Sequence, residues 1–122
     1  MLRRKAIFLF LSAEQLSGAG GAEVLDLVRD FGGMEYVPVP VIASATDEHV
    51  GEIVRLRTGA PVSRPLLLDG GFAPQRVWEF ARALDLDLER SVLVAPHTGL
   101  DAVFLTAGLR RILRPRRAQQ AA

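Results

Sequence analysis

The sequence predicts an α/β fold in three layers, with a mostly parallel four-stranded sheet between helices on both of its faces. Two observations predict this class. Apolar runs of strand length alternate with segments of helical periodicity, and glycine- or proline-containing turns separate them. The chain has 122 residues, of which 49% are hydrophobic, and this is enough for one core. We therefore expect a single domain over residues 1–114 and a basic, polar tail over residues 115–122.

Four apolar runs are expected to form the strands. They cover residues 5–11, 36–43, 65–68 and 91–95. Pro38 and Pro40 lie in the second run and cannot donate hydrogen bonds to a neighbouring strand. The second strand is therefore expected to start late or to lie at an edge of the sheet.

Four segments carry an apolar face at helical spacing. They cover residues 20–31, 46–58, 74–84 and 101–113. Thr46 or Asp47 can cap the second segment, and Pro74 suits the first turn of the third. We expect Trp78 on the apolar side of the third helix, and Pro115 ends the fourth.

Composition excludes several classes of protein. The chain has no cysteine, so it cannot form disulfides, thiolate metal sites or its own iron–sulfur ligation, and a cytoplasmic location is expected. The pattern of residues 3–11 resembles that of a signal peptide, but a buried first strand is the preferred interpretation. No apolar run in the sequence approaches the ~18–20 residues that a membrane span requires. Residues 110–117 are strongly basic and could contact nucleic acid, anionic lipid or an acidic partner. A solvated helix end is the simpler interpretation, so we expect neither specific nucleic-acid binding nor membrane association.

The candidate site lies in the loops that follow the strands, because ligands of such sheets bind at the carboxyl ends of the strands. His97 and Asp101 follow the fourth strand and could perform acid–base chemistry or supply part of a metal site. Asp101 could instead cap the last helix while His97 stays exposed. Gly70 and Gly71 could present backbone amides to an anion, or could simply form a tight turn.

Several of these loops resemble, in order, those of the small sirohydrochlorin chelatases. Family members have a strand reading Pro-Leu-Phe-Leu-x-x-Gly-Gly-His, and residues 65–72 read PLLLDGGF. A later family turn through Pro-Leu-Gly is similar to APHTGLD at residues 95–101. The first family strand ends in Gly-His-Gly-Ser, where this chain has Phe10-Leu11-Ser12-Ala13. The two family histidines thus fall on Leu11 and Phe72.

The resemblance implies a class II chelatase-like fold that pairs as a homodimer. Such proteins insert Co²⁺, Ni²⁺ or Fe²⁺ into a tetrapyrrole precursor, and their two histidines bind the metal. Leu11 and Phe72 have no lone pair to offer a metal. We therefore predict a protein that binds a tetrapyrrole or related ligand without normal metal insertion. The residues expected to contact the ligand are Phe10, Leu11, Ser12, Asp69, Gly70, Gly71, Phe72 and Arg76.

Two alternatives remain open, so the sequence does not decide whether the protein is an enzyme. The first is an active chelatase or metal-dependent enzyme in which His97, aided by Asp69 or Asp101, provides a rearranged metal or proton-transfer site. The second is a non-catalytic partner of another protein, held through an apolar surface where the site once was. Metal-dependent turnover would distinguish the first alternative, and stable co-purification without ligand affinity would distinguish the second.

Overall fold

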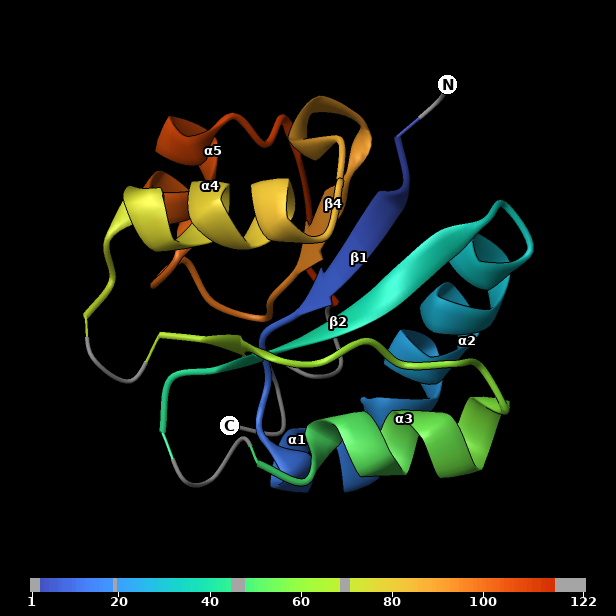
Figure 1. The fold of residues 1–122 in the computed structure, drawn as a ribbon. Coiled ribbons are helices and arrows are strands. Elements are labelled where there is room, and N and C mark those ends of the chain that lie inside the picture. Colours follow the sequence, from blue (N-terminus) through green and yellow to red (C-terminus); the bar gives the residue numbers. More distant parts are fainter. Residues whose placement is uncertain (1–2, 19, 45–47, 69–70, 116–122) are drawn as a thin grey trace.

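The structure, a computed structural model, describes residues 3–18, 20–44, 48–68 and 71–115. It contains a five-stranded, all-parallel sheet with the strand order β3-β2-β1-β4-β5 (Figure 1). The expected α/β architecture is therefore confirmed, with one strand more than expected. The strands are β1 Lys5–Leu9, β2 Tyr36–Ile42, β3 Leu66–Leu67, β4 Val92–Val94 and β5 Arg111–Leu113.

Helices cover both faces of the sheet, with α1 to α3 on one side and α4 and α5 on the other (Figure 1). Alternate side chains of β1 enter the two cores: Phe8 packs toward α4 and α5, and Ile7 packs toward α1 to α3. Burial on both faces explains why the strands read as continuous apolar runs. The helices are α1 Ala13–Ser17, α2 Gly21–Gly32, α3 Val50–Thr58, α4 Pro74–Ala83 and α5 Asp101–Ala107, with the 3-10 turn η2 at Leu88–Arg90.

Strand β2 corrects the expectation drawn from its prolines, because it lies inside the sheet between β3 and β1. The carbonyl oxygen of Pro38 accepts a hydrogen bond from the Ser63 N–H at 3.0 Å, on the β3 side. The backbone nitrogen and carbonyl of one strand residue point to the same side. The nitrogen atoms of Pro38 and Pro40, which carry no hydrogen to donate, therefore both face β3. Strand β3 pairs only from Val41 onward, beyond both prolines, and so no ladder bond is lost.

The last expected helix is also corrected, because α5 ends at Ala107 and residues 111–113 form β5 instead. Gly108 has a φ of 120°, which ends the helix. The Leu109 N–H donates to the Phe104 carbonyl and the Gly108 N–H donates to the Leu105 carbonyl, as in a Schellman motif. The chain then returns along β4, where Ile112 pairs with Leu93.

The other elements agree closely with expectation, except for α1, which lies in a segment expected to be a loop. Its start is a capping box: Ser12 Oγ accepts from the Gln15 N–H at 3.1 Å, and Gln15 Oε1 accepts from the Ser12 N–H at 2.9 Å. The expected caps Thr46 and Asp47 lie outside the described residues, as does the tail from residue 116. Among the helices that the structure describes, none is long and apolar enough to cross a membrane.

Candidate functional site

The carboxyl edge of the sheet brings the loops after β1 and β4 together, because these strands are neighbours at the point where the strand order reverses. Ser12 follows β1 at this edge, but its hydroxyl is engaged in capping α1. Leu11 is buried against α1 to α3, so it contributes to the core and offers no surface to a ligand. Phe10 is half-buried and packs against the other core.

The loop after β3 is described only in part. Phe72 and Arg76 are exposed, with 53% of Phe72 open to solvent, and Gly71 has a φ of 141°. This φ favours glycine in a turn, which agrees with the turn interpretation of that residue. The expected ligand residues Asp69 and Gly70 lie outside the described part of the chain.

His97 and Asp101 do not form the expected pair. Asp101 binds Arg114 instead, with the Arg114 Nη2 atom 2.6 Å from its Oδ2 atom, and the His97 side chain is exposed. Arg114 Nη1 also donates to the carbonyl oxygens of His97, at 2.6 Å, and Ala95, at 3.2 Å. Arg114 was not among the residues expected at the site, because its segment was read as the end of a helix.

Metal binding at this edge has little support from the side chains. The other oxygen of Asp101, Oδ1, is buried and has no hydrogen-bond partner among the described residues. Within the described residues, no group of three or more histidine or carboxylate side chains is placed to hold a metal ion. The carboxyl edge is thus held by an ion pair and by backbone hydrogen bonds.

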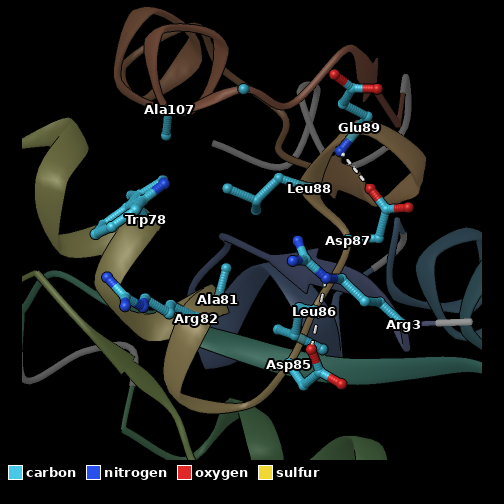
Figure 2. A pocket seen from close by; sticks show the side chains of 11 residues that line it. Arg3, Trp78, Ala81, Arg82, Asp85, Leu86, Asp87, Leu88, Glu89 and Ala107 are labelled. Atoms are coloured by element: carbon cyan, nitrogen blue, oxygen red, sulfur yellow. Dashed lines mark hydrogen bonds and ion pairs between the residues drawn. The ribbon is translucent and has the colours of Figure 1, made fainter. Parts of the chain in front are cut away.

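An open cavity of about 770 Å³ lies at the opposite, amino edge of the sheet (Figure 2). It is bounded by Arg3, two residues before β1, by the segment leading into β4, and by the facing sides of α4 and α5. The lining residues are Arg3, Trp78, Ala81, Arg82, Asp85, Leu86, Asp87, Leu88, Glu89, Ala107 and Gly108.

The floor of this cavity is apolar, and one wall carries Trp78 and Arg82 in contact with each other. Ala81, Leu86 and Leu88 are each at least about nine-tenths buried and form the floor. Trp78 is 47% exposed, although it was expected on the apolar side of its helix. The guanidinium carbon of Arg82 lies 5.3 Å from the centre of the Trp78 ring, which is cation–π geometry (Figure 2).

Most of the other charges around the cavity are already paired. Arg3 Nε lies 3.6 Å from Asp85 Oδ1, and Glu89 Oε1 lies 3.7 Å from Nη2 of Arg110. By contrast, Arg82 has no ion pair with any carboxylate in the described part of the chain. Arg82 thus lies at the edge of the cavity beside Trp78, with its charge uncompensated by a carboxylate among the described residues.

Comparison with known proteins identifies the fold class and no family. No protein-family model matches the chain, and no curated protein matches it. Among solved structures, it is similar to the core domain of a protein from Streptococcus pneumoniae provisionally assigned as a phosphoglycolate phosphatase, determined by NMR. The two chains are 17% identical, with a TM-score of 0.55, over 95% of this chain and 84% of the other. The chain is thus an α/β protein with a five-stranded parallel sheet, and this similarity shows the fold alone.

Proposed function

We propose that the protein binds a planar small molecule bearing a carboxylate, in the cavity at the amino edge, and does not transform it. The observation that carries this proposal is the Arg82 guanidinium, stacked on Trp78 and without a carboxylate partner among the described residues. A guanidinium offers several N–H donors in a plane, which matches the two oxygens of a carboxylate. The half-exposed indole supplies an aromatic surface for the body of the ligand.

The shape of the cavity supports a small molecule. Its volume of about 770 Å³ falls within the ~300–1,000 Å³ that is usual for small-molecule sites. Apolar side chains form its floor, and five of its eleven lining residues are charged: Arg3, Arg82, Asp85, Asp87 and Glu89. The walls therefore offer charged anchors to the polar groups of a ligand, while the floor and the Trp78 ring can contact its flat body.

Binding without turnover is the activity that the side chains support. The structural similarity to a provisionally assigned phosphoglycolate phosphatase raises phosphate-ester hydrolysis as another activity. Such hydrolysis needs an activated nucleophile or a metal-activated water. The described residues after β1 are Phe10, Leu11 and Ser12, and the Ser12 hydroxyl accepts the hydrogen bond that caps α1. The described part of the chain also holds no cluster of metal-binding side chains.

The tetrapyrrole ligand is proposed separately, on the resemblance of the loop sequences, and its place would be the carboxyl edge. The loops that carry the resemblance follow the strands there, on the opposite edge of the sheet from the cavity. Phe72 and Arg76 are exposed beside the loop after β3 and would be available to such a ligand. Normal insertion of Co²⁺, Ni²⁺ or Fe²⁺ has no support in the side chains, because His97 belongs to no group of three or more metal-binding residues in the described part of the chain.

A second candidate function, that of a non-catalytic protein partner or homodimer, is favoured by the exposed apolar side chains of α4 and α5. Trp78 on α4 and Leu105 on α5 are 47% and 49% exposed, and these helices pack against each other. Sedimentation velocity over a range of protein concentrations tests it. A dimer that Trp78→Ser dissociates, but Leu56→Ser on the far face does not, would favour self-association over ligand binding.

Titration with 4-methylbenzoate tests the proposed function, because it is a small planar carboxylate. Trp78 is the single tryptophan, so its fluorescence reports directly on the cavity. We expect a saturable change that Arg82→Gln weakens by about tenfold, since a charge-assisted hydrogen bond is removed. Arg55→Gln on α3 is the matched control and leaves the affinity unchanged. Equal affinity for the Arg82→Gln variant, or no saturation at millimolar concentrations, would contradict the proposal.

A parallel titration with sirohydrochlorin tests the tetrapyrrole. Its absorbance spectrum is followed with and without Co²⁺ or Ni²⁺. Saturable spectral change without metal-dependent conversion supports binding without insertion. Accelerated insertion that His97→Ala abolishes would instead support the active chelatase.

A further inference from the structure

The charges lining the cavity do not suit a ligand that is only anionic. Arg3 and Arg82 contribute two positive charges to the lining, while Asp85, Asp87 and Glu89 contribute three negative charges. The lining alone therefore carries a formal charge of minus one. A ligand that brings several carboxylates to Arg82 must also face these three acidic side chains, which disfavours polyanions.

The ion pairs identify where the excess negative charge lies. Arg3 compensates Asp85, and Arg110, just outside the lining, compensates Glu89. Asp87 forms no ion pair within the described part of the chain. Its Oδ1 atom accepts a hydrogen bond from the Glu89 N–H at 3.1 Å, and Figure 2 shows the carboxylate turned toward Glu89 at the rim of the cavity. Arg82 and Asp87 are therefore the two charged lining residues without an ion-pair partner in the described part of the chain.

These two residues lie on opposite sides of the apolar floor, with Leu86 and Leu88 between them (Figure 2). The separation means that one ligand can meet both only if its own charges stand at opposite ends of an apolar body. A carboxylate would then lie at the Trp78 side and a cationic group at the Asp87 side.

Asp87 is also held firmly in place before any ligand arrives. Its N–H donates to the Arg4 carbonyl at 2.8 Å, and its carbonyl accepts from Ser91 Oγ at 2.6 Å. The neighbouring residue Leu86 forms a bridge with Arg4. A half-buried carboxylate on such a fixed backbone loses little conformational entropy when it binds a cation.

From this arrangement we infer that the ligand is a zwitterion, with a flat apolar body, a carboxylate that binds Arg82 and a cationic group that binds Asp87. This inference rests on the proposed function and narrows its ligand class. It excludes polyanions as the preferred ligand, and it assigns Asp87 a role in ligand selection.

Three compounds with the same para-substituted ring test the inference: 4-methylbenzoate, 4-methylbenzylamine and 4-(aminomethyl)benzoate. At pH 7 they carry a negative charge, a positive charge and both charges. We expect 4-(aminomethyl)benzoate to bind at least about threefold more tightly than 4-methylbenzoate, the scale of a partly exposed ion pair. The affinities are read from Trp78 fluorescence and confirmed by calorimetry.

The variant Asp87→Asn separates the two charge contacts, because its side-chain oxygen can still accept from the Glu89 N–H. We expect it to remove the advantage of 4-(aminomethyl)benzoate while 4-methylbenzoate binds at least as tightly as before. Asp30→Asn, on an exposed position of α2, is the matched control and changes neither affinity. The unfolding midpoint in urea is measured for both variants, so that a loss of fold is recognised.

The outcomes separate the two claims. If 4-methylbenzoate binds through Arg82 but the added ammonium brings no gain, the inference is overturned and the proposed function stands. If the gain persists in Asp87→Asn, the cation is held elsewhere and the inference is also overturned. If neither carboxylate binds, the proposed function and this inference fail together.

Discussion

Arg114 and Asp101 form an ion pair in which Nη2 of Arg114 lies 2.6 Å from Oδ2 of Asp101, and this pair links the end of β5 to the start of α5. The same guanidinium donates to the His97 carbonyl in the loop after β4. The Arg114 side chain thus connects three segments at the carboxyl edge: the end of β5, the start of α5 and the loop after β4. Because Oδ1 of Asp101 is buried without a hydrogen-bond partner, the ion pair is what compensates the burial of this carboxylate.

Arg114→Ala is expected to lower the free energy of unfolding by about 1–3 kcal/mol, because it leaves a partly buried carboxylate and two carbonyl oxygens without their donor. Arg110→Ala is the matched control. Its guanidinium is 75% exposed and reaches Glu89 at only 3.7 Å, so a change within about 0.5 kcal/mol is expected. Urea denaturation of the two variants measures the difference, and equal stabilities would show that the Arg114 contacts contribute nothing.

Much of the fold could be predicted from the sequence because burial on both faces of the sheet leaves a clear pattern. Continuous apolar runs mark β1 and β4, and helical spacing of apolar residues marks α2 and α4. Strand β5 could not be found in this way, because Leu109 and Leu113 continue the apolar period of α5. Gly108, which has a φ of 120°, ends that helix, and a glycine is a recognised stop signal that the apolar period conceals here.

The cavity could not be predicted, because its charged residues come from distant parts of the chain. Arg3 and Asp85 meet only when β1 and the segment before β4 are placed side by side. Trp78 and Arg82 are four residues apart on α4, so their contact could have been expected from helical spacing alone. The sequence places Trp78 on the apolar side of its helix, but it does not indicate which aromatic side chains enter the core and which stay exposed.

Ser91 ties two distant segments together through a buried hydroxyl. It is 1% exposed; its Oγ accepts from the Ala6 N–H at 2.9 Å and donates to the Asp87 carbonyl at 2.6 Å. Ser91→Ala leaves that buried N–H without an acceptor, so we expect a loss of about 1–3 kcal/mol in the free energy of unfolding. Thermal or urea denaturation measures it, with exposed Ser17→Ala as the control. A loss no larger than that of the control would show that the Ala6 amide finds another partner.

Gly21 is required by the close approach of α1 and α2. A Cβ atom at this position would overlap the carbonyl oxygen of Leu16, which is backbone and cannot move aside easily. Gly21→Ala is therefore expected to destabilise the protein by at least about 1–3 kcal/mol, the usual scale for overpacking. Gly32→Ala is the matched control at the other end of α2, where a Cβ meets nothing within 4 Å. We expect Gly32→Ala to leave the free energy of unfolding unchanged or slightly raised, since alanine favours a helix. An unchanged free energy of unfolding in Gly21→Ala would contradict the prediction and show that the two helices can move apart.

His97→Ala tests whether the histidine at the carboxyl edge has a chemical role. The Arg114 guanidinium binds the backbone carbonyl of His97, which alanine keeps, and the imidazole is exposed. We therefore expect the free energy of unfolding to stay within about 0.5 kcal/mol of the original. Co²⁺ affinity, measured by calorimetry, is also expected to be unchanged, because no cluster of ligands surrounds His97 in the described residues. A clear loss of Co²⁺ binding in this variant, with stability intact, would instead make His97 a metal ligand and would favour the metal-dependent enzyme over the binding protein.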